Sequence, residues 1–377
     1  MNHIYFDNAA TTVVRSEAAD ATVRVMCEKY GNPSSVHIIG RRAAGELEAA
    51  RISVADALGT RPGNVFFTSG GTEADNWAVL GAAGMLARKG KHIVTSAIEH
   101  DAVIEPIKKL ERNGWEVTYI APDSAGRITS ESFADALRED TVFASVMLVN
   151  NETGAVNPVG EYASEISRRG LETVLHTDAV QGLCKIPFTV KSLGADLVSV
   201  SAHKLHGPKG VGALYIKQGL KLFPHIMGGS QEGGYRPGTE ALPAIAGFGE
   251  AARLGRLELN ETASAVRKLR DYITEQLREK LPEAVIIGKG DSPFVLSMSL
   301  PGHKSEVLMS FLDGEGICVS KSAACKKGAR SRILEAMSLK NEVIDGALRV
   351  SFSRYSTQDE AEQLINALKR ASETLMK

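Results

Sequence analysis

The sequence predicts an α/β fold in which helices cover both faces of a mainly parallel sheet, with a smaller α+β unit towards the C-terminal end. Between Val65 and Ile216, short apolar strand candidates alternate with helical stretches, which is typical of a parallel sheet. The 377 residues exceed what one hydrophobic core usually holds. After Gly247 a long, charged helical pattern runs to Lys280, and strands and helices then recur. We therefore expect two domains.

We expect the large domain to comprise residues 15–250. The small domain is expected to combine residues 1–14 with residues 251–377 and to carry the segment around Cys325. Within the large domain, the strand candidates are residues 92–96, 116–120 and 142–149, and residues 77–87 form an apolar helix candidate.

Composition excludes several classes of protein. The formal net charge of −1 and the sequence pI of about 6.8 give no reason to expect a nucleic acid or membrane partner. No apolar run approaches the roughly 20 residues of a membrane span, and the N-terminus lacks the pattern of a secretory signal. Four cysteines without a C-x-x-C pair fit a reducing cytoplasm and predict no metal site.

Lys204 stands at the end of a short apolar strand candidate, within residues 198–210, where Ser201, His203 and two glycines flank it. A lysine that leaves a strand end and is desolvated loses its proton readily and can hold a carbonyl cofactor covalently. The alternative is a surface lysine in a turn, which is what most lysines are. Lys204 alone does not decide between these interpretations.

Two further patterns favour the cofactor interpretation. Asp178 ends another apolar run, 26 residues before Lys204, and an acid there suits a protonated ring nitrogen. Gly70, Gly71 and Thr72 follow a strand candidate and open a helix, whose free N–H groups bind phosphate. Alternatively, Asp178 is only a helix N-cap and the glycine turn precedes an ordinary capped helix.

Cys325 differs from the other three cysteines. It precedes a basic segment, residues 326–330, and nearby positive charge favours the thiolate, which is the nucleophile. Cys27, Cys184 and Cys318 lie in apolar stretches and are expected to be small core residues. On composition alone, Cys325 is equally well an incidental exposed thiol.

Taken together, the motifs are similar to those of the cysteine desulfurases of the NifS and IscS type, which belong to the class V aminotransferases among the fold type I pyridoxal phosphate enzymes. The resemblance covers nearly the whole chain and follows one order along it. Its motifs are residues 5–12, 30–35, 70–73, 99–100, 150–154, 176–181, 198–210, 236–239, 322–325 and 348–354.

The resemblance implies a role for each matched residue. It implies pyridoxal 5'-phosphate as the cofactor, a seven-stranded sheet in the large domain, and L-cysteine as the substrate. Lys204, His100 and Cys325 would be catalytic, Asn151 and Arg349 would bind the substrate carboxylate, and Asp178 and Gln181 would contact the cofactor ring. The remaining cofactor residues would be Gly71, Thr72, Ser201 and His203, with His100 stacked on the ring and Thr239 reaching the phosphate of the other subunit in a homodimer.

The expected reaction converts L-cysteine to L-alanine and leaves a persulfide on Cys325. The sulfur would pass to an acceptor protein, such as an iron–sulfur scaffold or a tRNA-thiolation protein. A selenocysteine lyase or another class V lyase or aminotransferase would keep Lys204 and Asp178 without depending on Cys325. A non-enzymatic scaffold of the same fold is the third alternative, and the competent side chains at every required position disfavour it.

Overall fold

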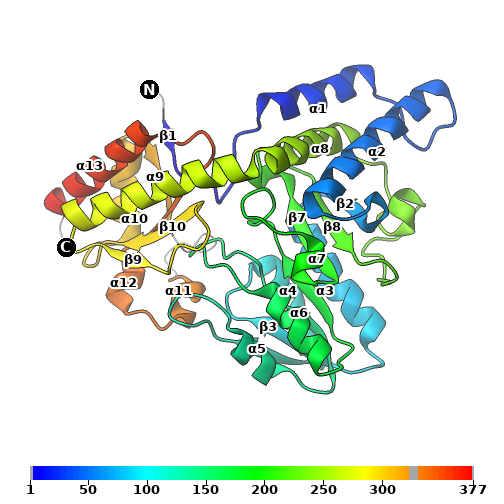
Figure 1. The fold of residues 1–377 in the computed structure, drawn as a ribbon, viewed down its shortest axis with the longest axis horizontal. Coiled ribbons are helices and arrows are strands. Elements are labelled where there is room, and N and C mark those ends of the chain that lie inside the picture. Colours follow the sequence, from blue (N-terminus) through cyan, green and yellow to red (C-terminus); the bar gives the residue numbers. More distant parts are fainter. Residues whose placement is uncertain (1–2, 322–329, 376–377) are drawn as a thin grey trace.

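The computed structural model describes residues 3–321 and 330–375. Cys325 therefore lies outside the described residues. The molecule is built around two sheets, one of seven strands and one of four, with a short two-stranded pairing at the N-terminal end (Figure 1).

The large sheet confirms the predicted α/β class. Its strand order is β2-β8-β7-β6-β5-β3-β4, and the pairings among β7, β6, β5, β3 and β4 are parallel. Only β8 runs antiparallel, to both β2 and β7. The strands are β2 (Val65–Thr68), β3 (His92–Ser96), β4 (Glu116–Ile120), β5 (Thr141–Ser145), β6 (Val174–Asp178), β7 (Leu197–Ser201) and β8 (Gly212–Ile216).

The register of this sheet places the predicted site residues at one edge. Strands β6 and β7 are buried along their whole length, as expected for apolar strands covered on both faces. Asp178, the last residue of β6, pairs with Ser199 of β7, and β7 continues to Ser201 and a short 3₁₀ turn, η2 (Ala202–Lys204). Asp178 and Lys204 therefore both leave the sheet at its carboxyl edge.

Helices cover the sheet on both faces and form two cores. On one face, α3 (Gly71–Leu86) and α4 (Asp101–Arg112) bury residues such as Trp77 and Ile107 against Phe143. On the other face, α2 (Ile38–Leu58), α5 (Ser130–Ala136), α6 (Val159–Arg168) and α8 (Leu242–Leu257) bury residues such as Tyr162 and Phe248. Helix α1 (Ser16–Glu28) packs along α8, while α7 (Val190–Leu193), η1 (Pro62–Asn64) and η3 (Gln231–Gly234) are short connections.

The smaller sheet has the antiparallel order β12-β13-β10-β9 and its own core. Ile4 and Phe6 from the N-terminal end join that core, and β1 pairs in parallel with β11. The strands are β1 (Ile4–Tyr5), β9 (Val285–Ile287), β10 (Val295–Ser299), β11 (Ile317–Cys318), β12 (Ser320–Lys321) and β13 (Ala347–Ser351), and the helices are α9 (Leu259–Lys280), α10 (Ser305–Gly314), α11 (Arg332–Ala336), α12 (Asn341–Asp345) and α13 (Gln358–Thr374).

Helices α8 and α9 run almost end to end along the molecule and connect its two parts (Figure 1). The sequence pattern suggested one long helix to Lys280, whereas the helix is interrupted at Glu258. The Glu258 carboxylate forms ion pairs there with Arg15 and Arg354. The interruption therefore lies where three distant segments of the chain meet.

Two local expectations were wrong. The predicted strand at residues 142–149 ends at Ser145, because the chain beyond it turns into a buried loop in which Val149 pairs with Val156. Cys27 is exposed rather than a core residue, because α1 buries Ala18 and Val25 on a different face of the helix. Cys184 and Cys318 are partly buried.

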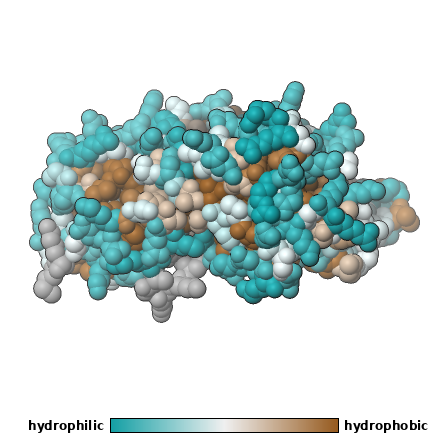
Figure 2. All heavy atoms as spheres, turned by 90° about the horizontal axis from the view of Figure 1, so that it is seen from below, coloured by the Kyte–Doolittle hydropathy of each residue, from teal (hydrophilic) through white to brown (hydrophobic). Residues whose placement is uncertain are grey.

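Within the described residues, no helix combines the length and the apolar character that crossing a bilayer requires. The surface in Figure 2 is mostly hydrophilic, with hydrophobic atoms gathered along the middle of the face and at the end where the α1–α2 connection projects. Exposed apolar side chains of α1, of that connection and of the start of α2 are Val23, Met26, Tyr30, Val36 and Ile38.

Candidate functional site

A cavity of about 330 Å³ opens at the carboxyl edge of the large sheet. Its wall comes from β6, β7, the start of α3, the segment around Ala9, and Arg349 of β13 in the smaller sheet. Ten of the twelve predicted site residues line it, namely Gly71, Thr72, His100, Asn151, Asp178, Gln181, Ser201, His203, Lys204 and Arg349. The other two predicted residues are Thr239, which does not line the cavity, and Cys325, which lies outside the described residues.

Lys204 enters this cavity from η2. Its Nζ donates to the carbonyl oxygens of Ala9 and Ala10, each at 2.7 Å. Burial lowers the pKa of Lys204 to about 8, and the positive charge of Arg349 acts in the same direction. A substantial share of the amine is therefore neutral near pH 8, as a nucleophilic lysine requires.

Asp178 lies in the floor of the cavity. It is 5 % exposed, and one carboxylate oxygen accepts the N–H of Val180 at 2.8 Å. Burial raises the pKa of Asp178, while the positive charges of His100 and Lys204 oppose the rise. A buried carboxyl group of this kind gains from a cation placed against it.

The start of α3 forms another wall. The first N–H groups of a helix have no partner within the helix, so this end attracts an anion. A Cβ at Gly71 would lie 2.7 Å from Cγ2 of Val180, so only glycine leaves the wall open there. Thr72 and Ser201 bring hydroxyl groups to the same cavity.

His203 and His100 are held by neighbouring groups. His203 Nδ1 lies 3.2 Å from the Thr11 hydroxyl, and burial with the nearby Lys204 charge lowers the pKa of His203 to about 4. His203 is thus neutral at pH 7. His100 caps α4 by accepting the Ala102 N–H on Nδ1, so a neutral His100 ring carries its proton on Nε2.

Asn151 and Arg349 meet on the side of the cavity that faces the smaller sheet. Arg349 is 2 % exposed, its Nη2 donates to Asp7 at 2.8 Å, and its Nη1 donates to the Asn151 carbonyl oxygen at 3.1 Å. Two of its nitrogen atoms are therefore fixed by the protein, and the guanidinium is held in place for a third contact.

Unpartnered buried atoms indicate that the cavity is built for a ligand. Within the described residues, Ser201 Oγ, Asp75 Oδ1, Asn151 Oδ1 and Arg349 Nε are buried and have no hydrogen-bond partner in the protein. All four residues line this cavity. Because buried polar groups are rarely left without a partner, the ligand has polar groups on several sides.

Thr239 is exposed. Its segment is attached to the start of α3 through Arg236. The Arg236 guanidinium contacts both carboxylate oxygens of Glu73, at 2.9 and 3.2 Å. Glu73 also accepts the Ser69 N–H, at 2.8 Å, so one carboxylate links the turn before α3 to the segment of Thr239.

Sequence reasoning missed two buried polar residues of this region. Asp75 lines the cavity and is 1 % exposed, and burial together with the Asp178 charge raises its pKa. Its position three residues after Thr72, near the start of an apolar helix, was the available indication. Lys185 is also buried and donates to Gln181 Oε1 at 2.9 Å. The spacing of four residues from Gln181 could have identified it.

Comparisons with known proteins agree with this geometry. A family model described as aminotransferase class-V matches residues 4–364. Cysteine desulfurase IscS of Dictyoglomus turgidum is 40% identical over 376 residues, covering 99% of this chain and 95% of that protein. Cysteine desulfurase IscS of Methanosarcina thermophila is 39% identical over 369 residues, covering 97% and 91%. A solved structure of a NifS-like protein has a TM-score of 0.94 and 37% identity, covering 99% of this chain and all of that chain.

Proposed function

Since the chain belongs to the class V aminotransferase family and, within it, to the cysteine desulfurases of the IscS and NifS type, we propose that it converts L-cysteine to L-alanine and retains the sulfur as a persulfide on Cys325. The observation that carries the proposal is the convergence of Lys204, Asp178, the α3 start and Arg349 on one cavity with four unpartnered buried polar atoms.

The family depends on pyridoxal 5'-phosphate, and the residues of this cavity fit that group. Lys204 holds it covalently, Asp178 pairs with its ring nitrogen, and Gln181 donates to its phenolic oxygen. The N-terminus of α3 with Gly71, Thr72, Ser201 and His203 holds its phosphate. When bound, the cofactor supplies an electron sink that labilises bonds of the substrate amino acid.

The protein residues then position the substrate and move protons. Arg349 and Asn151 bind the carboxylate of L-cysteine, because a guanidinium is the two-pronged partner of a carboxylate. Once the substrate amine has freed it from its covalent attachment, the Lys204 amine, with its pKa near 8, would take the proton from the substrate α-carbon. The His100 ring lines the same cavity and can pass protons.

Cys325 receives the sulfur in its thiolate form. Its Sγ forms a bond to the substrate sulfur as the bond between that sulfur and the β-carbon breaks. The electron pair remains on the β-carbon, which takes up a proton and becomes the methyl group of alanine. The transferred sulfur is thereby oxidised to the persulfide level and the carbon is reduced.

The proposal also covers the oligomeric state, the cellular compartment, the domain division and the sulfur acceptor. We propose a cytoplasmic homodimer in which Thr239 of one subunit contacts the cofactor phosphate of the other. This contact accounts for the exposure of Thr239, whose segment is attached to the start of α3 by the ion pair between Arg236 and Glu73. Residues 15–250 form the large domain, and residues 1–14 with residues 251–377 form the small domain. An acceptor protein, such as an iron–sulfur scaffold or a tRNA-thiolation protein, then removes the sulfur from Cys325.

The test compares the protein with its Cys325→Ser and Cys27→Ser variants. All three are reconstituted with pyridoxal 5'-phosphate, mixed with L-cysteine, and assayed for a visible cofactor band, alanine and protein-bound persulfide. We expect the band in all three proteins, and persulfide in the wild type and in Cys27→Ser only. Persulfide or sulfide release by Cys325→Ser at the wild-type rate would exclude the role of Cys325, and the absence of alanine from the wild type would exclude the reaction.

A further inference from the structure

Lys185 is a buried lysine that none of the roles above uses. It is 5 % exposed, and its Nζ lies 5.8 Å from the centroid of the Phe294 ring. No carboxylate in the described part of the chain forms an ion pair with it, and its hydrogen bond there goes to Gln181 Oε1. Burial lowers the pKa of Lys185 to about 7, because an ammonium group without a counter-ion is costly to bury, so a role outside folding explains its presence better.

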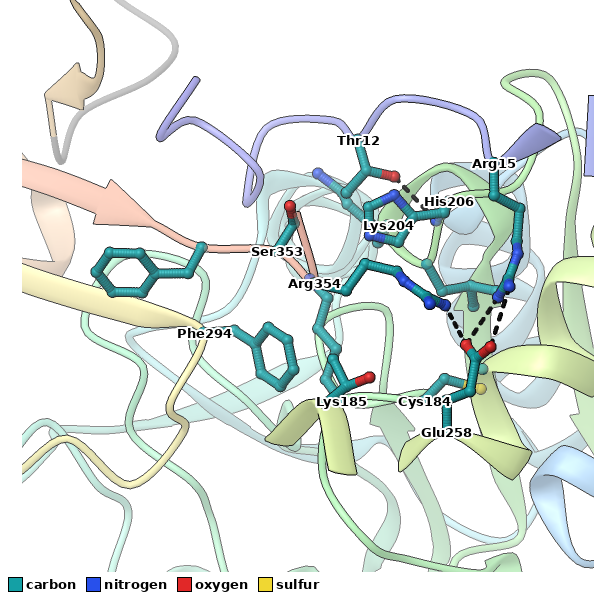
Figure 3. Close-up of a pocket in the computed structure, with 14 residues that line it drawn as sticks. Thr12, Arg15, Cys184, Lys185, Lys204, His206, Glu258, Phe294, Ser353 and Arg354 are labelled. Carbon is teal, nitrogen blue, oxygen red and sulfur yellow. Dashed lines mark hydrogen bonds and ion pairs between the residues drawn. The ribbon is translucent and has the colours of Figure 1, made fainter. Parts of the chain in front are cut away.

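Lys185 lines a small second cavity on the other side of Lys204 (Figure 3). Figure 3 shows Arg15 and Arg354 reaching Glu258 at the far side of this cavity, so the carboxylate that lines the cavity is already paired with two arginines. The cavity has a volume of about 30 Å³, which is room for about one water molecule. Lys185 is therefore not there to bind a ligand in this second cavity.

The backbone places Lys185 directly beside Gln181. Residues 179–186 form consecutive turns after β6, in which Gly182 N donates to Ala179 O at 2.8 Å and Lys185 N donates to Gly182 O at 3.0 Å. Cys184, between the two residues, has a left-handed backbone with φ 58°, and the 2.9 Å hydrogen bond from Lys185 Nζ to Gln181 Oε1 brings the two side chains together. Gln181 lines the cavity proposed to hold the cofactor, whereas Lys185 lines the small second cavity.

Contacts on both sides determine which end of the Gln181 amide faces which neighbour. The Lys185 Nζ donates to the Gln181 amide oxygen at 2.9 Å, so the oxygen end of the amide faces Lys185. The carbonyl oxygen of Ala9 has only acceptor sites, so the amide nitrogen turns to it, at 2.8 Å. That carbonyl also accepts from Lys204 Nζ at 2.7 Å, which completes a chain of hydrogen bonds from Lys185 through Gln181 and Ala9 to Lys204.

We propose that Lys185 is a positioning residue that fixes the orientation of the Gln181 amide, so that its NH₂ group, and not its oxygen, is presented to the phenolic oxygen of the bound cofactor. The inference rests on the proposed function and adds to it a residue that touches neither cofactor nor substrate. Without Lys185, only the contact with the Ala9 carbonyl oxygen favours this orientation, so the amide turns its oxygen towards the phenolic oxygen, where two acceptors repel each other, in a larger share of the molecules.

The test uses Lys185→Met, which keeps most of the apolar stem and removes all donors. Lys185→Arg retains donors, and Lys191→Met is the matched control, because Lys191 is exposed six residues away. Each holoenzyme is titrated with pyridoxal 5'-phosphate and, separately, with pH while the visible cofactor band is recorded. Thermal unfolding is measured on the same samples.

For Lys185→Met we expect cofactor binding about tenfold weaker, the effect of one lost hydrogen bond. We also expect an upward shift of the pH midpoint of the visible band, because a donor to the phenolic oxygen favours its deprotonated form. Lys185→Arg recovers part of both effects. In a Gln181→Ala background, Lys185→Met produces no further change in either readout, since the two residues act as one unit.

Wild-type affinity and midpoint in Lys185→Met would overturn the inference, as would equal effects in the wild-type and Gln181→Ala backgrounds. A lower melting temperature with an unchanged midpoint would show a packing role instead, and so would also overturn it. If Lys185→Met does not fold, Lys185→Gln is measured against the same criteria. A wild-type protein with no cofactor band overturns the proposed function itself, which separates the two failures.

Discussion

Arg236 forms a two-pronged ion pair with Glu73, and the same carboxylate accepts the backbone N–H of Ser69. The pair connects two segments that are 163 residues apart. One is the turn that opens α3, and the other carries the exposed Thr239. A single carboxylate thus holds together the turn proposed to bind the cofactor phosphate and the segment proposed to reach the other subunit.

Replacing Glu73 by Gln is expected to weaken cofactor binding about fivefold to tenfold. The substitution keeps the shape of the side chain but removes the charge that holds Arg236, and charge-assisted pairs of this geometry are among the stronger hydrogen bonds. The dissociation constant of pyridoxal 5'-phosphate is measured by titration of the apoprotein. Glu48→Gln is the control, because the Glu48 side chain is 58% exposed and its ion pair with Arg51 is long, with 3.8 Å between Glu48 Oε2 and Arg51 Nε. Equal affinities of Glu73→Gln and the wild type would contradict the link.

Replacing Lys204 by Ala is expected to abolish covalent attachment of the cofactor while leaving weaker, non-covalent binding. The other groups of the cavity, among them Asp178 and the α3 start, remain in place. Borohydride reduction followed by mass spectrometry detects the covalent adduct. Lys209→Ala, which changes an exposed lysine five residues away, serves as the control and is expected to keep the adduct. An adduct in Lys204→Ala would show that another amine is the anchor.

The neutral share of Lys204 sets a pH dependence for cofactor attachment. The pKa of about 8 is below the ordinary lysine value of 10.5, so the nucleophilic amine becomes the major form as pH rises through 8. The rate at which the apoprotein captures the cofactor is therefore expected to rise about tenfold between pH 7 and pH 9, with a midpoint near 8. Stopped-flow absorbance measures this rate. A rate that stays flat across this range would exclude a titrating Lys204.

Replacing Arg349 by Lys is expected to raise KM for L-cysteine at least tenfold with a smaller change in cofactor affinity. Lysine keeps the charge but loses the planar fork that is held by Asp7 and the Asn151 carbonyl. Steady-state kinetics of alanine formation measure KM. The exposed Arg370, replaced by Lys, is the control. An unchanged KM in Arg349→Lys would place the substrate carboxylate elsewhere.

Glu99 is expected to make the protein less stable as pH rises from about 5 to 8. Burial raises the pKa of Glu99 from 4.5 to about 8, so the folded protein holds a proton that the unfolded chain releases. The stabilisation is complete below the unfolded pKa of 4.5 and is lost as pH rises through the folded pKa of 8. The free energy of unfolding in urea should fall by a few kcal/mol over this range, and less in Glu99→Gln. Exposed Glu111→Gln is the control, and equal pH slopes in Glu99→Gln and wild type would refute the assignment.

Much of the fold follows from local patterns that can be read in the chain. The runs that end at Asp178 and Ser201 became neighbouring parallel strands, because short segments with apolar residues and few charges between turns and helices are buried on both faces of a sheet. The break at Glu258 did not follow, because helical periodicity continues across it and only the distant Arg15 and Arg354 distinguish that carboxylate. Cys27 misled because an apolar stretch in sequence is not a buried face: Val23 and Met26 are exposed with it, and of these neighbours only Val25 is buried.

The sequence by itself determined the α/β class, because that class depends on local periodicity, and its motifs, through their resemblance to a known family, identified the ten predicted residues that meet in one cavity. Only the tertiary structure decided how those residues are held. The fixation of Arg349 by Asp7, the pairing of Glu73 with Arg236 and the burial of Asp75 and Lys185 depend on segments that lie far apart in the chain or on neighbours beyond their own turn. Burial and long-range contact set the pKa values and amide orientations of the site, and neither can be derived from spacing along the sequence.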